Sequence, residues 1–554
     1  MNPFNDNYFL GYVNEVTPQY VKIHFPSSTL LNRFHHEGTN YAGGGVGNFI
    51  VIEGEEYGFL AQMTEIKLSD SEKKELTAKA IEHKDSDFRP IGKAELLLSF
   101  NVFSPEKIQK TASKYPLIGA KVYSCSDDQI RKYVAEFGKK KDENENVYAT
   151  LGKLVTNDAE CNVSLNSLFG RHCAVVGTTG GGKSWTVSKL IEEVTTQTNN
   201  KIILIDATGE YSKVSNKTLS FGENVKFPYK YLSNSDFCFL FQENSPNTVS
   251  ALCESIHSLK MIKLNEFTDG IKIGKDSTNI SEQIRANIHH FYNCDFDITQ
   301  LSIQLKNECV KVGKNNVYEE DTFKLGYTSH LISRVNLFLN NSTICLALGI
   351  NETEKKTQRK EDIVKAIQDF ISGDEQILRI SFEKLSYDFS IREIIVDFIS
   401  SFLLKESRKG AFKNNPIILC IDEAHQFLNK RVNAEDNTIF SLQSIDLIAK
   451  ECRKYGLFLC LATQMPRDIP IGTLSQMGTF IVHRLINEKD KQAIENAASS
   501  ANRNALSFLP ILGEGEALLV GVDFPMPLFI KIDEPKTPPN SNTPRLSKKS
   551  IENS

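Results

Sequence analysis

The chain has 554 residues, of which 24% are charged and 40% hydrophobic, with a formal net charge of −5. This composition is ordinary for a globular protein, and the length is enough for two or three domains. The sequence contains no apolar run of about 18 residues and no signal-peptide pattern, so we expect a cytoplasmic protein without membrane contact. The eleven cysteines are scattered without a CxxC pair, which predicts reduced thiols rather than disulfides or a zinc site. Because the net charge is negative, contact with nucleic acid would require a local basic surface or a channel.

Residues 1–150 predict a small N-terminal β-barrel domain. The region contains several short runs that alternate apolar and polar residues and are separated by turn residues. Short strands at such close intervals are typical of an antiparallel barrel. The predicted strands lie within Tyr8–Phe25, Gly47–Ile66, Ala94–Phe100 and Ala120–Tyr123.

Residues 151–534 predict an α/β domain with a mostly parallel sheet. Continuous apolar runs are typical of strands buried on both faces, and they occur at Lys201–Asp206, Pro416–Asp422 and Leu457–Thr463. A helix is expected at Phe440–Lys454, and a mostly helical insertion at about 215–410. Residues 535–554 are rich in proline, serine and asparagine and predict a flexible tail.

The clearest motif is a glycine-rich turn between an apolar strand and an amphipathic helix. From Gly177 to Ser184 the spacing is GxxxxGK[ST], as in phosphate-binding loops. Glycines allow backbone N–H groups to approach phosphate oxygens, Lys183 adds a positive charge, and the Ser184 hydroxyl can ligate Mg²⁺. The alternative is a glycine-rich turn that merely contains Lys-Ser. The predicted nucleotide-binding residues are Gly177, Thr178, Thr179, Gly180, Gly181, Gly182, Lys183 and Ser184.

A second motif ends the apolar run of residues 416–422. Asp422 is placed to hold Mg²⁺ beside the nucleotide, and Glu423 to polarise the attacking water. This pattern is typical of NTPases that hydrolyse their nucleotide. An Asp-Glu pair after a strand can also be an ordinary start of a loop.

Two further polar residues stand at the ends of predicted strands. Asp206 ends one strand and Gln464 follows another, so we expect both at the carboxyl edge of the sheet, where ligands bind. Asp206 could serve catalysis or cap the turn made with Gly209. Gln464 could contact the γ-phosphate or its water, or could be a turn amide.

Arg453 stands at the end of the predicted helix 440–454. One interpretation is an arginine finger that completes the site of a neighbouring subunit. The alternative is a cation that the helix dipole favours at a C-terminus. Arg484 is a second candidate for the finger, or a residue at the end of a strand.

These motifs resemble the HerA family of hexameric ATPases, relatives of the FtsK-type DNA translocases. The resemblance covers about residues 1–535 and is weaker in the barrel and the insertion. The motor motifs that carry it are RHCAVVGTTGGGKSWTVSKL (171–190), DATGEY (206–211), IDEAHQF (421–427), ECRKYG (451–456), LATQMPRDIP (461–470) and TFIVHRLINEKD (479–490).

The resemblance implies a RecA-like P-loop NTPase fold behind a HAS-barrel-like domain. It further implies a homo-hexameric ring with ATP and Mg²⁺ at the subunit interfaces and double-stranded DNA in the central channel. Carried over, Lys183 and Ser184 bind phosphate and Mg²⁺, Asp206 and Glu423 serve catalysis, Gln464 senses the nucleotide, and Arg453 acts in trans. DATGEY stands where the family usually has DPHGEY, so Ala207 and Thr208 replace Pro-His while the two carboxylates are kept.

Three functional hypotheses follow. The first is a DNA-translocating or unwinding motor that works with a partner nuclease or other effector docked on the ring. The second is an ATPase scaffold that assembles an antiviral effector, a nuclease or a Sir2-like enzyme, through the barrel. The third is an NTPase that remodels proteins. Stimulation of ATP hydrolysis by DNA distinguishes them.

Overall fold

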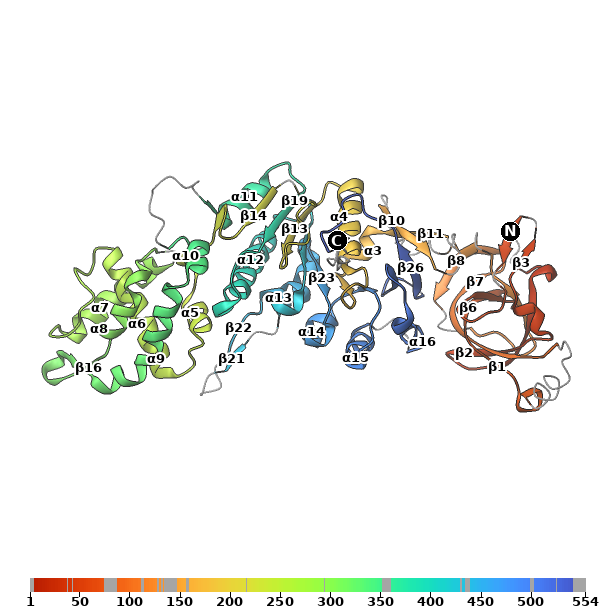
Figure 1. Cartoon of the computed structure of the whole chain (residues 1–554), viewed down its shortest axis with the longest axis horizontal. Helices are drawn as coiled ribbons and strands as arrows, with labels where there is room; N and C mark the ends of the chain where they lie inside the picture. Colours follow the sequence, from red (N-terminus) through yellow and green to blue (C-terminus); the bar gives the residue numbers. More distant parts are fainter. Residues whose placement is uncertain are drawn as a thin grey trace, which may run out of the picture. The chain divides into compact units, whose positions relative to one another are not determined.

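The computed structural model describes residues 4–541 except 37, 42, 74–86, 111–113, 127–128, 131–132, 134–146, 156–158, 216, 293, 351–359, 429–430, 434–438, 499–502 and 525. The chain divides into two compact units, whose elements are labelled in Figure 1. The first unit comprises Met1–Asn199, Ala462–Arg467 and Leu474–Pro538, and the second Asn200–Leu461, Asp468–Thr473 and Pro539–Ser554.

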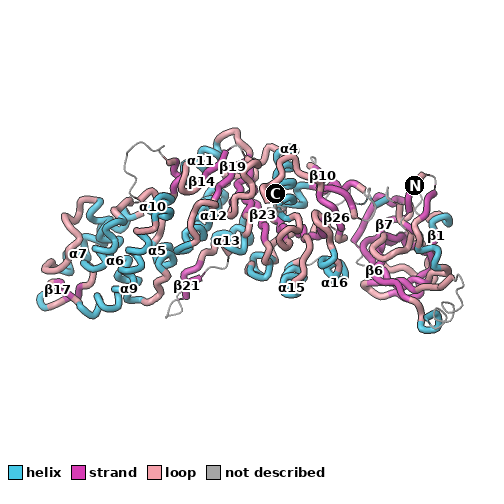
Figure 2. Tube along the Cα trace, viewed as in Figure 1, coloured by secondary structure: helices cyan, strands magenta, loops and turns pink. Residues whose placement is uncertain are grey.

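Six strands of the first unit close into a barrel (Figure 2). Their order is β2-β1-β9-β5-β6-β7, and β2 pairs with β7 to complete the circle. Leu10, Val21 and Ile23 belong to its fully buried core. The predicted N-terminal barrel is confirmed. The strands are β1 (Phe9–Val16), β2 (Tyr20–His24), β5 (Phe49–Ile52), β6 (Tyr57–Lys67), β7 (Ile91–Asn101) and β9 (Lys121–Ser124), with β8 (Ser104–Lys110) beside β7 and β3 (Phe34–His36) paired with β4 (Thr39–Tyr41).

The other strands of the first unit have the order β11-β10-β26-β25-β24-β12. Strand β12 runs parallel to β24, and the other neighbouring pairs in this order are antiparallel. Helix α4 packs on β10, β12 and β26. The elements are β10 (Tyr148–Leu154), β11 (Glu160–Ser164), α3 (Leu165–Phe169), β12 (Cys173–Val176), α4 (Lys183–Gln197), β24 (Thr479–Val482), α15 (Glu488–Ala497), α16 (Arg503–Ser507), β25 (Glu516–Gly521) and β26 (Leu528–Ile532).

The strands of the second unit have the order β23-β20-β13-β19-β14, and each runs parallel to its neighbours. The mixed sheet has 11 strands in all, and the predicted α/β fold with a mostly parallel sheet is confirmed. The elements are β13 (Lys201–Asp206), β14 (Lys217–Ser220), β19 (Ile377–Ser381), α12 (Ile391–Arg408), β20 (Ile417–Ile421), β21 (Arg431–Asn433), β22 (Ile439–Ser441), α13 (Ser444–Glu451), β23 (Leu457–Thr463) and α14 (Ile471–Leu474).

Between β14 and β19 the second unit is mostly helical, and α6, α8 and α9 pack on one another. The sequence predicts a mostly helical insertion here, and this region is mostly helical. The elements are β15 (Val225–Lys226), α5 (Asn234–Phe241), α6 (Pro246–Lys263), α7 (Ser277–Asn287), α8 (Leu301–Asn307), β16 (Val310–Val312), β17 (Tyr318–Glu320), α9 (Thr322–Leu339), α10 (Ser342–Leu348), β18 (Glu361–Asp362) and α11 (Ile363–Ser372). Of the helices in the described ranges, none alone is long and apolar enough to span a membrane, whereas α9 and α10, bent by 78°, meet that test as a pair.

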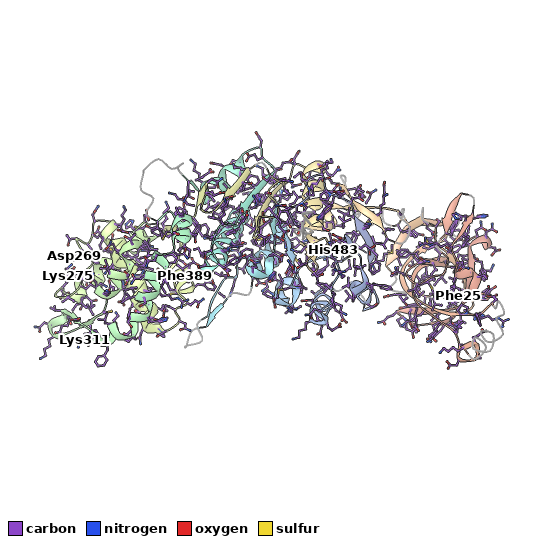
Figure 3. The ribbon with its side chains drawn as sticks, viewed as in Figure 1. Phe25, Asp269, Lys275, Lys311, Phe389 and His483 are labelled. Carbon is purple, nitrogen blue, oxygen red and sulfur yellow. The ribbon has the colours of Figure 1, made fainter. Side chains whose placement is uncertain are left out.

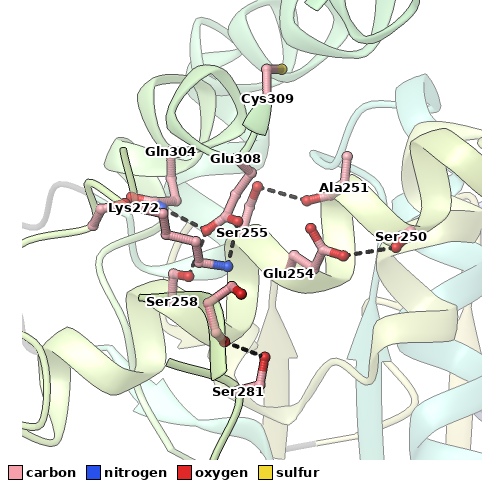
Figure 4. A network of polar contacts seen from close by, with 12 residues as sticks. Ser250, Ala251, Glu254, Ser255, Ser258, Lys272, Ser281, Gln304, Glu308 and Cys309 are labelled. Carbon is pink, nitrogen blue, oxygen red and sulfur yellow. Dashed lines mark hydrogen bonds and ion pairs between the residues drawn. The ribbon is translucent and has the colours of Figure 1, made fainter. Parts of the chain in front are cut away.

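A buried polar network joins the helices of this region (Figure 4). The fully buried Glu308 carboxylate lies 2.6 Å from the Lys272 ammonium and accepts hydrogen bonds from Ser258 Oγ (2.5 Å) and Gln304 Nε2 (2.8 Å). A buried charge is tolerated when it is paired and hydrogen-bonded in this way. The network therefore fixes α6 and α8 against the segment that carries Lys272.

One side chain after β24 holds the start of α4 in the first unit. His483, labelled in Figure 3, is fully buried, and its Nε2 lies 2.8 Å from Thr186 Oγ1 on α4. Its Nδ1 lies 2.9 Å from the Glu516 carbonyl oxygen. Since a carbonyl only accepts, Nδ1 carries a proton, and in the neutral ring Nε2 accepts from the Thr186 hydroxyl. The neutral imidazole therefore connects α4 to the start of β25.

We expect the first unit to lose stability in acid because of this histidine. Burial, opposed by the hydrogen bond to the Glu516 carbonyl and reinforced by the Lys183 ammonium, lowers the pKa of His483 to about 4. In the unfolded chain the pKa of this histidine is about 6.5, so as the pH falls the unfolded state takes up the proton before the folded state does. Stability is therefore lost progressively between about pH 6.5 and about pH 4, by about 3 kcal/mol in total.

The measurement is the midpoint of thermal unfolding between about pH 7.5 and about pH 5. The midpoint of the wild type should fall more steeply than that of His483→Gln, whose amide cannot take up the proton. His289→Gln, at an exposed position, is the matched control and should keep the wild-type slope. Equal slopes for the wild type and His483→Gln would contradict the prediction.

Candidate functional site

The predicted phosphate loop lies between β12 and α4 in the first unit. Gly180 and Gly182 adopt φ angles of 75° and 105°, in the left-handed region that favours glycine. Gly182 is the N-cap residue of α4 and has no side chain that could cover the first turn. Lys183 is buried and Ser184 is half-buried at the start of the helix. The backbone therefore has the form that an N-terminal anion site requires.

The residues around this loop hold it from the strands beside it. Thr178 donates to the Arg484 carbonyl oxygen through both its backbone N–H and its hydroxyl, each at 3.1 Å. The hydroxyl of Thr179 donates to the Gln464 side-chain oxygen. The structure therefore brings Gln464 and Arg484 to the loop, as expected for residues that follow strands at one edge of a parallel sheet.

In the second unit, Asp206 and Asp422 lie at the ends of two neighbouring parallel strands. Ile205 of β13 is in register with Ile421 of β20, and the Asp422 N–H donates to the Ile205 carbonyl oxygen at 3.0 Å. Both carboxylates are fully buried. Burial, with Asp422 nearby, raises the pKa of the Tyr211 phenol well above its usual range. The carboxyl ends of β13 and β20 thus place two acidic side chains together.

The contacts of Asp206 agree with the turn-capping alternative. It accepts from the Gly209 N–H at 2.8 Å and the Tyr211 N–H at 3.2 Å, and both Nε and a terminal nitrogen of Arg379 lie 2.7 Å from its Oδ2. Arg379 is also buried, so the two charges form a desolvated ion pair. The pair and the two amides fix the turn of DATGEY, and the catalytic role of Asp206 stays a prediction.

Glu423 has an unusual backbone for a residue with a side chain. Its φ of 47° and ψ of 46° are left-handed, which costs roughly 1–2 kcal/mol for an L-residue other than glycine. Strained backbone of this kind clusters at functional sites. The side chain is 5% exposed, and one carboxylate oxygen lies 3.3 Å from His425 Nδ1. The conformation sets the direction of a carboxylate at the end of a central strand.

The two candidate arginines differ in exposure. Arg453 is exposed, and it follows α13 in a short 3₁₀ turn rather than ending one long helix. The predicted helix 440–454 is wrong at both ends, because Phe440 lies in β22 and α13 spans Ser444–Glu451. Arg484 is half-buried beside the phosphate loop of its own chain.

Three residues of these sites were not singled out from the sequence: His483, Arg379 and Arg392. Arg392 is buried on α12 and donates to the Leu385 and Ala207 carbonyl oxygens, which holds the loop after β13. An arginine inside an apolar strand, such as Arg379, signals a buried partner. His483 gives no such signal, because a single histidine after a strand is common.

Two models of HerA domains match the chain. The model described as Helicase HerA, central domain matches residues 149–406, and Helicase HerA-like C-terminal matches residues 399–552. The chain is 24% identical over 417 residues to the DNA double-strand break repair helicase HerA of Sulfolobus acidocaldarius, covering 72% of this chain and 71% of that relative. It is 26% identical over 422 residues to the probable DNA double-strand break repair helicase HerA of Methanocaldococcus jannaschii, covering 70% and 78%.

Solved structures give weaker likenesses. VirB4 of Thermoanaerobacter pseudethanolicus matches with a TM-score of 0.43 and 13% identity, covering 71% of this chain and 98% of that one. The bacterial conjugative coupling protein TrwB matches with a TM-score of 0.43 and 11% identity, covering 73% and 98%. At these scores the assignment rests on the sequence matches alone. By these matches and its phosphate-loop motif, the chain belongs to the HerA helicase family, a family of P-loop ATPases.

Proposed function

We propose that this protein is an ATP-hydrolysing ring motor that translocates on or unwinds double-stranded DNA. The observation that carries the proposal is the match of two HerA helicase models, which extend over residues 149–552, to a chain with an intact phosphate loop. The relatives from Sulfolobus acidocaldarius and Methanocaldococcus jannaschii are both named as DNA double-strand break repair helicases. Their names support DNA as the substrate of the motor.

We assign the nucleotide to residues 177–184, with ATP phosphates held by the backbone N–H groups and by Lys183. Ser184 and Asp422 are the proposed protein ligands of Mg²⁺, since hydroxyl and carboxylate oxygens suit this ion. In the described residues no group of three or more His, Cys, Asp or Glu could hold a metal, and Mg²⁺ is commonly bound by one or two protein oxygens plus substrate phosphates. The cation would neutralise charge on the phosphates.

The remaining roles concern hydrolysis. Glu423 orients and polarises the attacking water, and its fixed left-handed backbone suits a group that must point in one direction. Gln464, bonded to Thr179 of the loop, transmits the state of the γ-phosphate. Asp206 contributes by holding the turn next to Asp422 and, in our proposal, by its charge near the water.

Six subunits are proposed to form the ring, with each site completed by a neighbour. Arg453 is the preferred finger because it is exposed and can reach outward. Arg484 is less suited, because it is half-buried beside the loop of its own chain.

The barrel is the proposed docking place of a partner effector, a nuclease or a Sir2-like enzyme. Three apolar side chains of the barrel region are well exposed: Phe103 (83%), Leu117 (65%) and Ile118 (72%). Contiguous exposed apolar surface marks interaction sites, and Leu117 and Ile118 are neighbours in the sequence. The scaffold alternative, in which ATP mainly assembles an antiviral effector, uses the same surface and differs in requiring no DNA.

Glu423→Gln is expected to keep ATP binding and to lower turnover by about 10²- to 10⁴-fold, because the amide cannot accept a proton from water. Lys183→Ala should weaken ATP binding itself. The measurements are equilibrium binding of ATP and steady-state release of phosphate. Glu488→Gln, on α15 with a side chain 83% exposed, is the control and should match the wild type. Normal turnover in Glu423→Gln would remove that residue from its role.

Duplex DNA is expected to stimulate ATP hydrolysis if the protein is a motor. The effect should weaken as salt rises from about 50 to about 200 mM, because phosphate contacts release counterions. The experiment measures phosphate release with and without duplex DNA across this range, in the presence of the partner. A turnover rate that is the same with and without DNA at every salt concentration would refute the motor hypothesis and favour the scaffold hypothesis.

Arg453→Ala should abolish most hydrolysis in homogeneous rings, by about 10³-fold or more, because charge on the transferring phosphoryl group is no longer stabilised. Mixing Arg453→Ala subunits with Glu423→Gln subunits should restore some turnover, since an interface formed by the intact sides of both is complete. Lys454→Ala, in the same exposed turn, serves as the control and should stay active. If intact mixed rings hydrolyse no ATP at any ratio of the two variants, action of Arg453 in trans is excluded.

A further inference from the structure

A cavity of about 830 Å³ lies beside the phosphate loop in the first unit, and none of the roles above uses it. Its wall includes Gly182 of the loop and Trp185 of the first turn of α4. The ends of β10 and β26 and the segment before β25 complete the wall. This volume is within the range of pockets that bind small organic molecules.

The cavity wall is bonded directly to the loop. The Gly515 N–H donates to the Gly181 carbonyl oxygen at 3.3 Å. A Cβ atom at Gly182 would lie 3.0 Å from Gly515 Cα and 3.3 Å from His483 Cε1. The loop and the cavity are therefore contiguous, and a ligand whose phosphates fill the loop enters the cavity by extending past Gly182.

The direction of a bound nucleotide follows from the chemistry of the loop. The lysine of such a loop reaches the β- and γ-phosphates, whereas the backbone also cradles the α-phosphate. Ribose and base hang from the α-phosphate, at the end away from the γ-phosphate. Trp185 directly follows Ser184 and lines the same cavity as Gly182 of the loop.

The lining suits a base and not a further phosphate. Trp185 is half-buried, and Val155 and Ile532 add apolar surface. Aromatic side chains stack on the faces of nucleobases. Four acidic residues and two basic residues share the wall, and an excess of carboxylates repels phosphate but accepts hydrogen bonds from exocyclic amino groups. They are Glu514, Glu516, Asp533 and Glu534, with Lys153 and Lys531.

We propose that this cavity is the nucleobase-binding pocket of the ATP site, in which Trp185 stacks on a purine that carries an exocyclic amino group. The inference rests on the proposed function, since it requires the phosphates to occupy residues 177–184. It assigns base recognition to Trp185 and to the acidic side chains of the wall. Base and phosphates are thus recognised by separate groups of the same chain.

The test uses the fluorescence of Trp185, because the chain contains a single tryptophan. The full-length protein is titrated with the Mg²⁺ complex of a non-hydrolysable ATP analogue and, separately, with Mg²⁺ tripolyphosphate, which has no base. The analogue should change the emission of Trp185. Tripolyphosphate should compete with the analogue for the loop but leave the emission close to that of the free protein.

Variants separate stacking from phosphate binding. Trp185→Ala should lower the affinity for the analogue by about tenfold, which is the effect expected when one stacking contact with a base is lost. The affinity for tripolyphosphate should stay unchanged. Trp185→Phe should stay within a few-fold of the wild type. Phe323→Ala removes an aromatic side chain that is 86% exposed on α9 and should have no effect. Tripolyphosphate binding by each variant reports that the loop is folded.

The outcomes distinguish this inference from the proposed function. If the analogue binds but Trp185→Ala keeps full affinity for it, the assignment of this cavity to the base is wrong while the ATPase proposal stands. The same holds if a uridine analogue binds as tightly as the adenosine analogue. If neither the analogue nor tripolyphosphate binds to the wild type, the proposed function fails and this inference fails with it.

Discussion

The support of the phosphate loop by His483 is the interaction on which the first unit's site depends. A glycine-rich loop has many accessible backbone conformations, and only contacts from outside the loop can select one of them. His483 supplies such contacts, since its ring bonds Thr186 on α4 and the Glu516 carbonyl at β25. Burial lowers the pKa of the ring, so at neutral pH the ring is uncharged, with Nδ1 as the donor and Nε2 as the acceptor. The loop's geometry thus depends on two hydrogen bonds made by one buried side chain.

In the second unit, an ion pair fixes the turn that follows β13. Asp206 and Asp422 are fully buried at the ends of adjacent strands, and two carboxylates in such a place repel each other. Arg379 neutralises Asp206 from the neighbouring strand β19, and two backbone amides complete its hydrogen bonds. Asp422 is then the acidic group of this edge that is proposed to hold Mg²⁺, and Glu423 is the one proposed to polarise the attacking water. The departure from DPHGEY leaves this arrangement intact, because the bonds of Asp206 use the backbone of Gly209 and Tyr211.

Much of this organisation could be predicted from local patterns. The barrel strands, the buried strands at 201–206, 417–421 and 457–463, and the loop at 177–184 all have strong short-range signals. The predicted helix around residue 450 is too long at both ends, because its apolar spacing continues into residues that form β22 and a 3₁₀ turn. The partners of Asp206 could not be predicted, because Arg379 is far from it in sequence and only strand order makes them neighbours.

Sequence alone determined the chemistry that this protein carries: a lysine and a hydroxyl after a glycine-rich turn, and a carboxylate pair after a buried strand. These motifs are local, and their residue types have few other uses at that spacing. Only the tertiary structure decided which side chains support them and what lies beside them. His483, Arg379 and the cavity at Trp185 all arise where segments distant in sequence meet. Such meetings depend on strand order and packing, which no local pattern encodes.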